Sequence, residues 1–104
     1  MSDQNKYESR QVQEALQVLI HLGGHEVNGL KPSEIGKSLN LAAHRMTRIL
    51  ANLRLAGVAE EIPESSRWRL SPRIPQIATA MLTELDKGQR KLDETKERFT
   101  KHPH

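Results

Sequence analysis

Apolar residues recur at helical spacing in the middle of the chain, where Met46, Ile49, Leu50 and Leu53 lie three or four positions apart. This spacing predicts an α-helix over 42–56 with one apolar stripe. Its other faces carry three arginines and no aspartate or glutamate. Such a helix suits burial on one side and contact with a polyanion on the other, although an ordinary solvated face gives the same pattern. The neighbouring elements favour one of these interpretations.

A first helix is predicted from about Ser9 to Leu22, with Ser9 as its N-cap and the following glycine pair as its end. Its expected buried stripe consists of Val12, Ala15, Leu16, Leu19 and Leu22, widened by Val18 and Ile20. His21 and His25 have the four-residue spacing of helical metal ligands, but the glycine pair between them interrupts the helix. We therefore expect two ordinary surface histidines and no metal site.

A second, short helix follows, because Pro32 suits a first helical position. Its expected buried residues are Ile35 and Leu39. Gly36 costs roughly 1 kcal/mol relative to alanine inside a helix, so we expect a packing reason, such as close approach of another helix. Asn40 adopts the left-handed conformation readily and turns the chain tightly into the helix over 42–56. Two helices joined in this way form a helix-turn-helix in which the basic helix is the second.

A β-hairpin is predicted after Gly57, with strands at 58–62 and 67–70 around a turn rich in proline and serine. Alternation along the second strand places its tryptophan and leucine inward. The same alternation places Arg67 and Arg69 outward, where they could reach phosphates or a minor groove. A hairpin directly after a helix-turn-helix is a wing.

A long last helix is predicted from Pro72 or Arg73 to Phe99. Its seam alternates four- and three-residue steps, through Ile74, Ala78, Met81, Leu85, Gly88, Leu92, Thr95 and Phe99. A small core cannot cover a helix of roughly 40 Å. We therefore predict a homodimer held by this helix, with fraying beyond Gly88 as the alternative. The predicted domains are a flexible arm over 1–8, a winged helix-turn-helix over 9–71, and a dimerisation helix with its tail over 72–104.

Composition narrows the class of protein. The chain has 104 residues, a net charge of +3 and a pI of about 9.5, which permits a nucleic-acid partner without requiring one. It has no cysteine, so disulfides, thiolate zinc sites and cysteine nucleophiles are excluded. No run approaches a membrane span or a signal peptide, so we expect a cytoplasmic, nucleoid-associated protein. Without a phosphate-binding loop or a carboxylate pair in an obvious cleft, we expect neither an enzyme nor a cofactor.

From about Ala15 to Leu70 the sequence resembles the winged helix-turn-helix domain of IclR-type transcriptional regulators. The resemblance is carried by ALQVLIHL, GLKPSEIGKSLNL, HRMTRILANLRLAGVAE and RWRL. This family favours a small residue at Gly36 and commonly has arginine at Arg48. It usually has glycine where Asn40 stands, and Ser-Thr where 44–45 reads His-Arg, so its operator preference does not transfer. Nothing here matches the family's effector domain, so no small-molecule effector is expected.

The combined prediction is a mainly α fold with a small β-hairpin wing, which binds double-stranded DNA as a bacterial or phage regulator. The helix over 42–56 would enter the major groove and the wing over 63–69 would contact the backbone or minor groove. Base contacts are expected from Ala43, His44, Arg45, Thr47 and Arg48, and further contacts from Lys31, Ser33, Lys37, Arg67 and Arg69. The alternative is a winged helix that docks on an acidic protein, because residues 1–71 are almost neutral.

Overall fold

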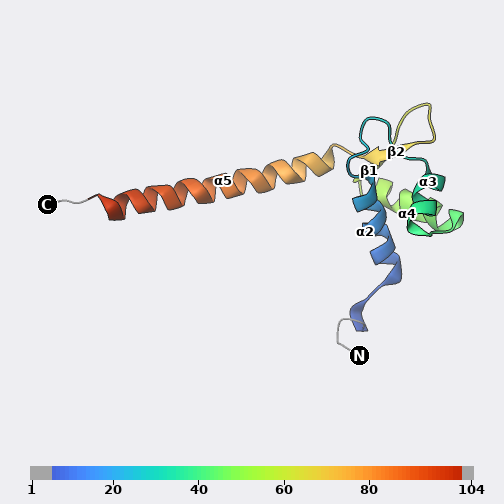
Figure 1. Cartoon of the computed structure of the whole chain (residues 1–104), viewed down its shortest axis with the longest axis horizontal. Helices are drawn as coiled ribbons and strands as arrows, with labels where there is room; N and C mark the ends of the chain where they lie inside the picture. The colour runs from blue at the N-terminus through green and yellow to red at the C-terminus, as the bar shows by residue number, and fades with distance from the viewer. Residues whose placement is uncertain (1–5, 102–104) are drawn as a thin grey trace. The chain divides into compact units, whose positions relative to one another are not determined.

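The computed structural model describes residues 6–101. Most of the arm predicted over 1–8 and the end of the tail after residue 101 lie outside the described residues. The chain forms two compact units, which divide between Arg73 and Ile74. The described residues are mainly helical, with a small antiparallel hairpin and a long C-terminal helix, so the predicted fold class is confirmed (Figure 1).

The first unit is a helix-turn-helix followed by a wing (Figure 1). Its elements are α2 (Arg10–Leu22), α3 (Pro32–Leu39), α4 (Ala43–Leu55), β1 (Ala59–Glu61) and β2 (Trp68–Leu70). The strands pair antiparallel, with Ala59 opposite Leu70 and Glu61 opposite Trp68. Because α3 leads into α4 through a very short turn, the predicted helix-turn-helix with the basic helix second is confirmed.

Local signals in the sequence set the ends of these helices. The Ser9 hydroxyl accepts a hydrogen bond from the backbone N–H of Val12 at 3.3 Å, so Ser9 is the N-cap of α2. Asn40 is left-handed, with φ 58° and ψ 51°, and ends α3. A Cβ on Gly36 would lie 2.8 Å from the carbonyl oxygen of Leu41. The expected packing reason for this glycine is therefore confirmed, although the closest atom belongs to the turn rather than to another helix.

The core lies where α2, α3, α4 and the hairpin meet. Its fully buried side chains are Val18, Leu22, Ile35, Met46 and Leu50, and all four residues of the predicted α4 stripe are buried. The stripe predicted for α2 is wrong in part: Val12 is 55% exposed and Leu16 is 47% exposed, whereas Val18 is completely buried. α2 carries apolar residues on more than half of its circumference, and the packing of α3, α4 and β2 selects which of them are covered.

The α2–α3 loop joins the hairpin, which the sequence did not suggest. The N–H of Leu30 donates to the carbonyl of Trp68 at 2.9 Å, and the N–H of Trp68 donates to the carbonyl of Leu30 at 2.8 Å. Trp68 is buried, as predicted, and the Arg54 guanidinium lies 4.9 Å from its ring centroid. These two hydrogen bonds attach the second strand of the wing to the loop that precedes α3.

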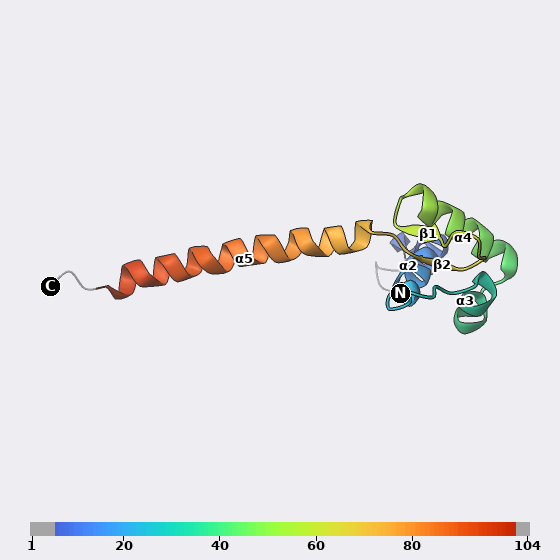
Figure 2. The ribbon, with the colours of Figure 1, turned by 90° about the horizontal axis from the view of Figure 1, so that it is seen from above.

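The second unit is formed by α5 (Arg73–Thr100) from Ile74 onward, and α5 runs as one continuous helix (Figure 2). None of its residues is buried. Met81, Leu85, Leu92 and Phe99 of the predicted seam are more than half exposed, whereas Ile74 at its start is partly buried. Within residues 6–101, no helix is both long and apolar enough to cross a membrane.

Candidate nucleic-acid interface

The solvent side of α4 carries polar and basic side chains and no acid. His44, Thr47 and Arg48 are exposed there, and Ala43 lies exposed at the first position of the helix. The Thr47 hydroxyl donates to the carbonyl of Ala43 at 3.1 Å, so its oxygen remains able to accept a further hydrogen bond. Within residues 6–101, no acidic side chain pairs with Arg48. This guanidinium is therefore available for a partner molecule.

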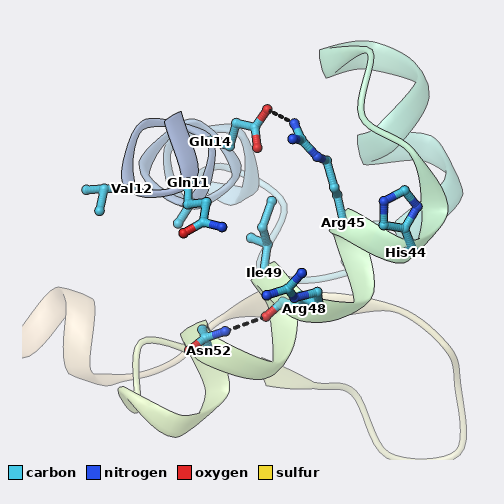
Figure 3. A pocket seen from close by; sticks show the side chains of 9 residues that line it. Gln11, Val12, Glu14, His44, Arg45, Arg48, Ile49 and Asn52 are labelled. Carbon is cyan, nitrogen blue, oxygen red and sulfur yellow. Dashed lines mark hydrogen bonds and ion pairs between the residues drawn. The ribbon is translucent and has the colours of Figure 1, made fainter. Parts of the chain in front are cut away.

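A hollow of about 420 Å³ separates α2 from α4 (Figure 3). It is lined by Gln11, Val12, Glu14, Ala15, His44, Arg45, Arg48, Ile49 and Asn52. Figure 3 shows Arg45 reaching from α4 toward α2, while Ile49 lies between the two helices. Asn52 donates its side-chain amide to the carbonyl of Arg48 at 2.8 Å. The hollow thus has an apolar floor and a rim of side chains from the basic helix.

Arg45 is held by an acid from α2. Its Nη1 lies 2.6 Å from Oε2 of Glu14, and the same oxygen accepts a hydrogen bond from Nε of Arg10 at 3.3 Å. The Glu14 side chain is only 12% exposed and that of Arg45 is 32% exposed. The pair is therefore a short, charge-assisted contact in a partly dehydrated place, which is the stronger kind of hydrogen bond.

This pair competes with any role of Arg45 in reading bases. Removing one partner from a buried, hydrogen-bonded charge pair costs about 2–5 kcal/mol, and the partial exposure of Arg45 places this pair toward the lower value. A bidentate contact between arginine and guanine supplies about 1–3 kcal/mol of discrimination. On these magnitudes, exchanging Glu14 for a guanine would bring Arg45 little or no net gain. The sequence does not predict this pair, because Glu14 lies 31 positions from Arg45. The one hint in the sequence is that Glu14 is the sole acidic residue of the predicted first helix.

The two wing arginines are held on the protein. Arg67 donates from Nε to the carbonyl of Asn28 at 2.8 Å, and its Nη2 lies 3.3 Å from a carboxylate oxygen of Glu34. Arg69 donates from Nε to Glu60 on the paired strand at 2.8 Å. Both side chains remain about one third exposed, and both are paired within the domain. Acidic and carbonyl partners from distant segments cover them, which the local pattern cannot reveal.

The predicted phosphate contacts on α3 are solvent-facing. All three are exposed: Lys31 and Ser33 lie at the start of α3, and Lys37 lies in its last turn. Between them, Glu34 accepts a hydrogen bond from the backbone N–H of Lys31 at 2.8 Å. This bond lowers the pKa of the Glu34 carboxyl below its ordinary value. Partial burial opposes that effect without cancelling it, and the positive charge of Arg67 lowers the pKa a little further. Glu34 therefore stays ionised and braces the start of α3.

The two histidines noted in the sequence lie near one another, with ring centroids 6.2 Å apart. In the part of the chain that the structure describes, no three histidine, aspartate or glutamate side chains gather as a metal site would require.

No protein-family model and no curated protein matches this chain. Among solved structures it is similar to an IclR transcriptional regulator from Alicyclobacillus acidocaldarius, with 28% identity and a TM-score of 0.62, over 71% of this chain and 30% of that one. It is also similar to the Zalpha domain of cyprinid herpesvirus 3, whose structure concerns its binding to Z-DNA, with 25% identity and a TM-score of 0.51, over 57% of this chain and 93% of that one.

The HmgR protein of Pseudomonas aeruginosa shares the fold, with a TM-score of 0.65 at 18% identity, over 75% of this chain and 33% of that one. This chain thus spans about a third of each of these two bacterial proteins. The element order, the short turn at Asn40 and the hairpin after α4 agree with these likenesses. The chain contains a winged helix-turn-helix domain that is similar to the DNA-binding domain of IclR-type regulators.

Proposed function

We propose that this protein binds double-stranded DNA and regulates transcription, with α4 in the major groove. The observation that carries the proposal is the solvent side of α4, where His44, Thr47 and Arg48 stand exposed on a helix with no acidic residue. The second helix of a helix-turn-helix is the one that enters the groove, with its N-terminal residues toward base edges. The similarity to an IclR regulator at 28% identity supports the same function.

The contacts that we expect outside α4 depend on which basic side chains are exposed and which are already paired within the domain. Lys31, Ser33 and Lys37 are exposed on α3 and suit phosphate oxygens. Arg67 and Arg69 are paired with Glu34 and Glu60 but keep about a third of their side chains exposed, so each could donate a further hydrogen bond to the DNA backbone beside the wing. Such contacts set register and orientation, whereas the α4 side chains read sequence.

The test is binding of random-sequence and genomic duplexes at several salt concentrations, with Arg48→Ala beside the wild type. Arg90→Ala on α5 is the matched control, because it removes the same charge from a different unit. We expect affinity to fall steeply with salt, and Arg48→Ala to lose most of the site preference while Arg90→Ala keeps it. Absence of binding to any duplex at low salt would refute the function and direct attention to an acidic protein partner.

We further propose that α5 pairs with α5 of a second copy. Its support is a row of large apolar side chains that are about half or more exposed: Ile77, Met81, Leu82, Leu85, Leu92 and Phe99. Exposed apolar residues at heptad-like spacing on a long helix are typical of a helix–helix interface. A dimer would present two α4 helices to two half-sites, which predicts an inverted repeat in the DNA.

Sedimentation equilibrium tests the dimer. Leu85→Lys should shift the mass from dimer to monomer, because the substitution places a charge in the seam, whereas Gln89→Lys, outside the seam, should leave the mass unchanged. A monomer for the wild type at micromolar concentration would exclude the α5 dimer without bearing on DNA binding by the single domain.

A further inference from the structure

We propose that Glu14 assigns different roles to the two arginines at the start of α4: it holds Arg45 as a positioning residue and leaves Arg48 as the arginine that reads bases. The inference rests on the proposed DNA binding. Sequence alone makes the two arginines equivalent candidates, because both lie near the N-terminus of a helix with a basic face. The structure separates them.

Arg45 points away from the solvent side of α4. Figure 3 shows its side chain directed at α2, where it meets the Glu14 carboxylate at 2.6 Å. The Glu14 carboxylate is largely shielded from water. If Arg45 moved away, this carboxylate would keep only a weaker partner, because Arg10 lies 3.3 Å from it and has a mostly exposed side chain. Arg45 therefore fastens α4 to α2 and fixes the angle at which α4 is presented.

Arg48 lies three positions further along α4, at the rim of the same hollow, with an exposed side chain. In the described residues no carboxylate pairs with it. Its guanidinium keeps all its donors for a partner, and a planar group with two parallel N–H donors matches the O6 and N7 acceptors of guanine. His44 and Thr47 flank it on the exposed surface, so one short stretch of α4 carries the readout.

The carboxylate also lowers the positive charge that DNA meets at this end of α4. Neutralising Glu14 while keeping its size should release Arg45 for a phosphate or a base. The released arginine adds about one phosphate contact, which steepens the dependence of log affinity on log salt by about 0.9. Affinity for arbitrary duplexes at low salt should rise several-fold, and the ratio between specific and arbitrary sequences should fall.

The experiment measures affinity for a selected duplex, for all its single-base variants and for an arbitrary duplex, over a salt series. The variants are Glu14→Gln, Arg45→Ala, Arg48→Ala and the double variant Glu14→Gln/Arg45→Ala. The control is Glu84→Gln, which removes one exposed negative charge from α5. Circular dichroism establishes that each variant is folded, and Glu14→Gln alone suffices for the test should Arg45→Ala unfold.

We expect Arg48→Ala to lose about tenfold or more discrimination at one base pair, and Arg45→Ala to keep the wild-type base preference with a lower melting temperature. Glu14→Gln should steepen the salt dependence, whereas the double variant and Glu84→Gln should not. A purely structural role for Glu14 would lower stability without moving the salt slope.

Three outcomes overturn the inference. In the first, Arg45→Ala flattens the base preference while Arg48→Ala leaves it intact. In the second, Glu14→Gln matches the wild type in salt slope and base preference. In the third, the double variant gains as much affinity as Glu14→Gln, which means that a general charge effect acts rather than Arg45. In each case the wild type still binds DNA, so the proposed function stands. If the wild type binds no duplex, the proposed function fails and the assignment fails with it.

Discussion

Replacing Gly29 by alanine should loosen the wing from the helices. Gly29 has φ +68°, a conformation that side chains disfavour. A Cβ there would lie 2.7 Å from the carbonyl oxygen of Trp68 and 2.7 Å from Cδ1 of Ile62. Ile62 can shift the end of its side chain, but the carbonyl belongs to the backbone and accepts the hydrogen bond from Leu30. The substitution therefore strains the loop and breaks its bridge to the hairpin.

The cost has two parts. Alanine in the left-handed conformation costs about 1–2 kcal/mol, and crowding a packed region costs about 1–3 kcal/mol. We expect the free energy of unfolding to fall by about 2–5 kcal/mol. Since small domains have about 5–15 kcal/mol in total, this loss is a large fraction of the stability. With a urea dependence of about 1 kcal/mol per M, the unfolding midpoint should fall by about 2 M or more.

Urea unfolding followed by tryptophan fluorescence measures this directly, because Trp68 is the sole tryptophan of the chain and lies at the contact. Gly24→Ala is the matched control: Gly24 has φ +92°, but nothing lies within 4 Å of its Cβ position. It should lose only the conformational part, about 1–2 kcal/mol. If Gly29→Ala and Gly24→Ala differ by less than about 0.5 kcal/mol, the close approach to Trp68 contributes nothing and the reasoning is wrong.

Three further changes test other parts of the domain. Because folding lowers the pKa of Glu34, its negative charge stabilises the fold at pH values above its ordinary pKa of 4.5, and this stabilisation is lost as the pH falls through the lower pKa of the folded state. The difference in unfolding free energy between wild type and Glu34→Gln, measured by urea titration, should therefore shrink toward acid pH. A difference that does not change with pH would contradict this. Ser71→Ala should lower stability by about 1–2 kcal/mol, because the buried hydroxyl donates to the carbonyl of Gly57 at 2.5 Å; an unchanged melting temperature would exclude that role. Leu50→Ala should cost about 2–5 kcal/mol in calorimetry, whereas Leu55→Ala, at an exposed position of the same helix, should cost little.

The sequence was sufficient for the elements whose signals are local. The left-handed Asn40, the N-cap Ser9 and the α4 stripe are determined by residues within a few positions of one another, and the structure has them as predicted. The buried side of α2 was predicted only in part, because Leu16 and Val18 are both strongly apolar and only the packing of other elements distinguishes them. The burial of Trp68 was predicted correctly, because the alternation of polar and apolar residues along one strand is also a local signal.

At the candidate interface, too, the sequence predicted the local features but not the contacts between distant residues. The residue types on α4 indicated a polyanion partner without any tertiary information. Whether each arginine is free depends on acids that are distant in sequence: Glu14 for Arg45, and Glu34 for Arg67. Periodicity and spacing describe one element at a time, so they cannot show which charges are already paired within the fold.

The backbone bridge between Leu30 and Trp68 has a consequence for how the domain folds. The α2–α3 loop and β2 are the two parts of the first unit that must meet, and Arg67 repeats the connection to Gly29 across 38 positions. Closing a loop of that length costs chain entropy before the contact repays it, so we expect this long-range contact to form late in folding. A chain that ends before β2 leaves both backbone groups of Leu30 without partners. The helix-turn-helix is therefore not a detachable module, and a truncated product lacking the hairpin should be recognised as unfolded.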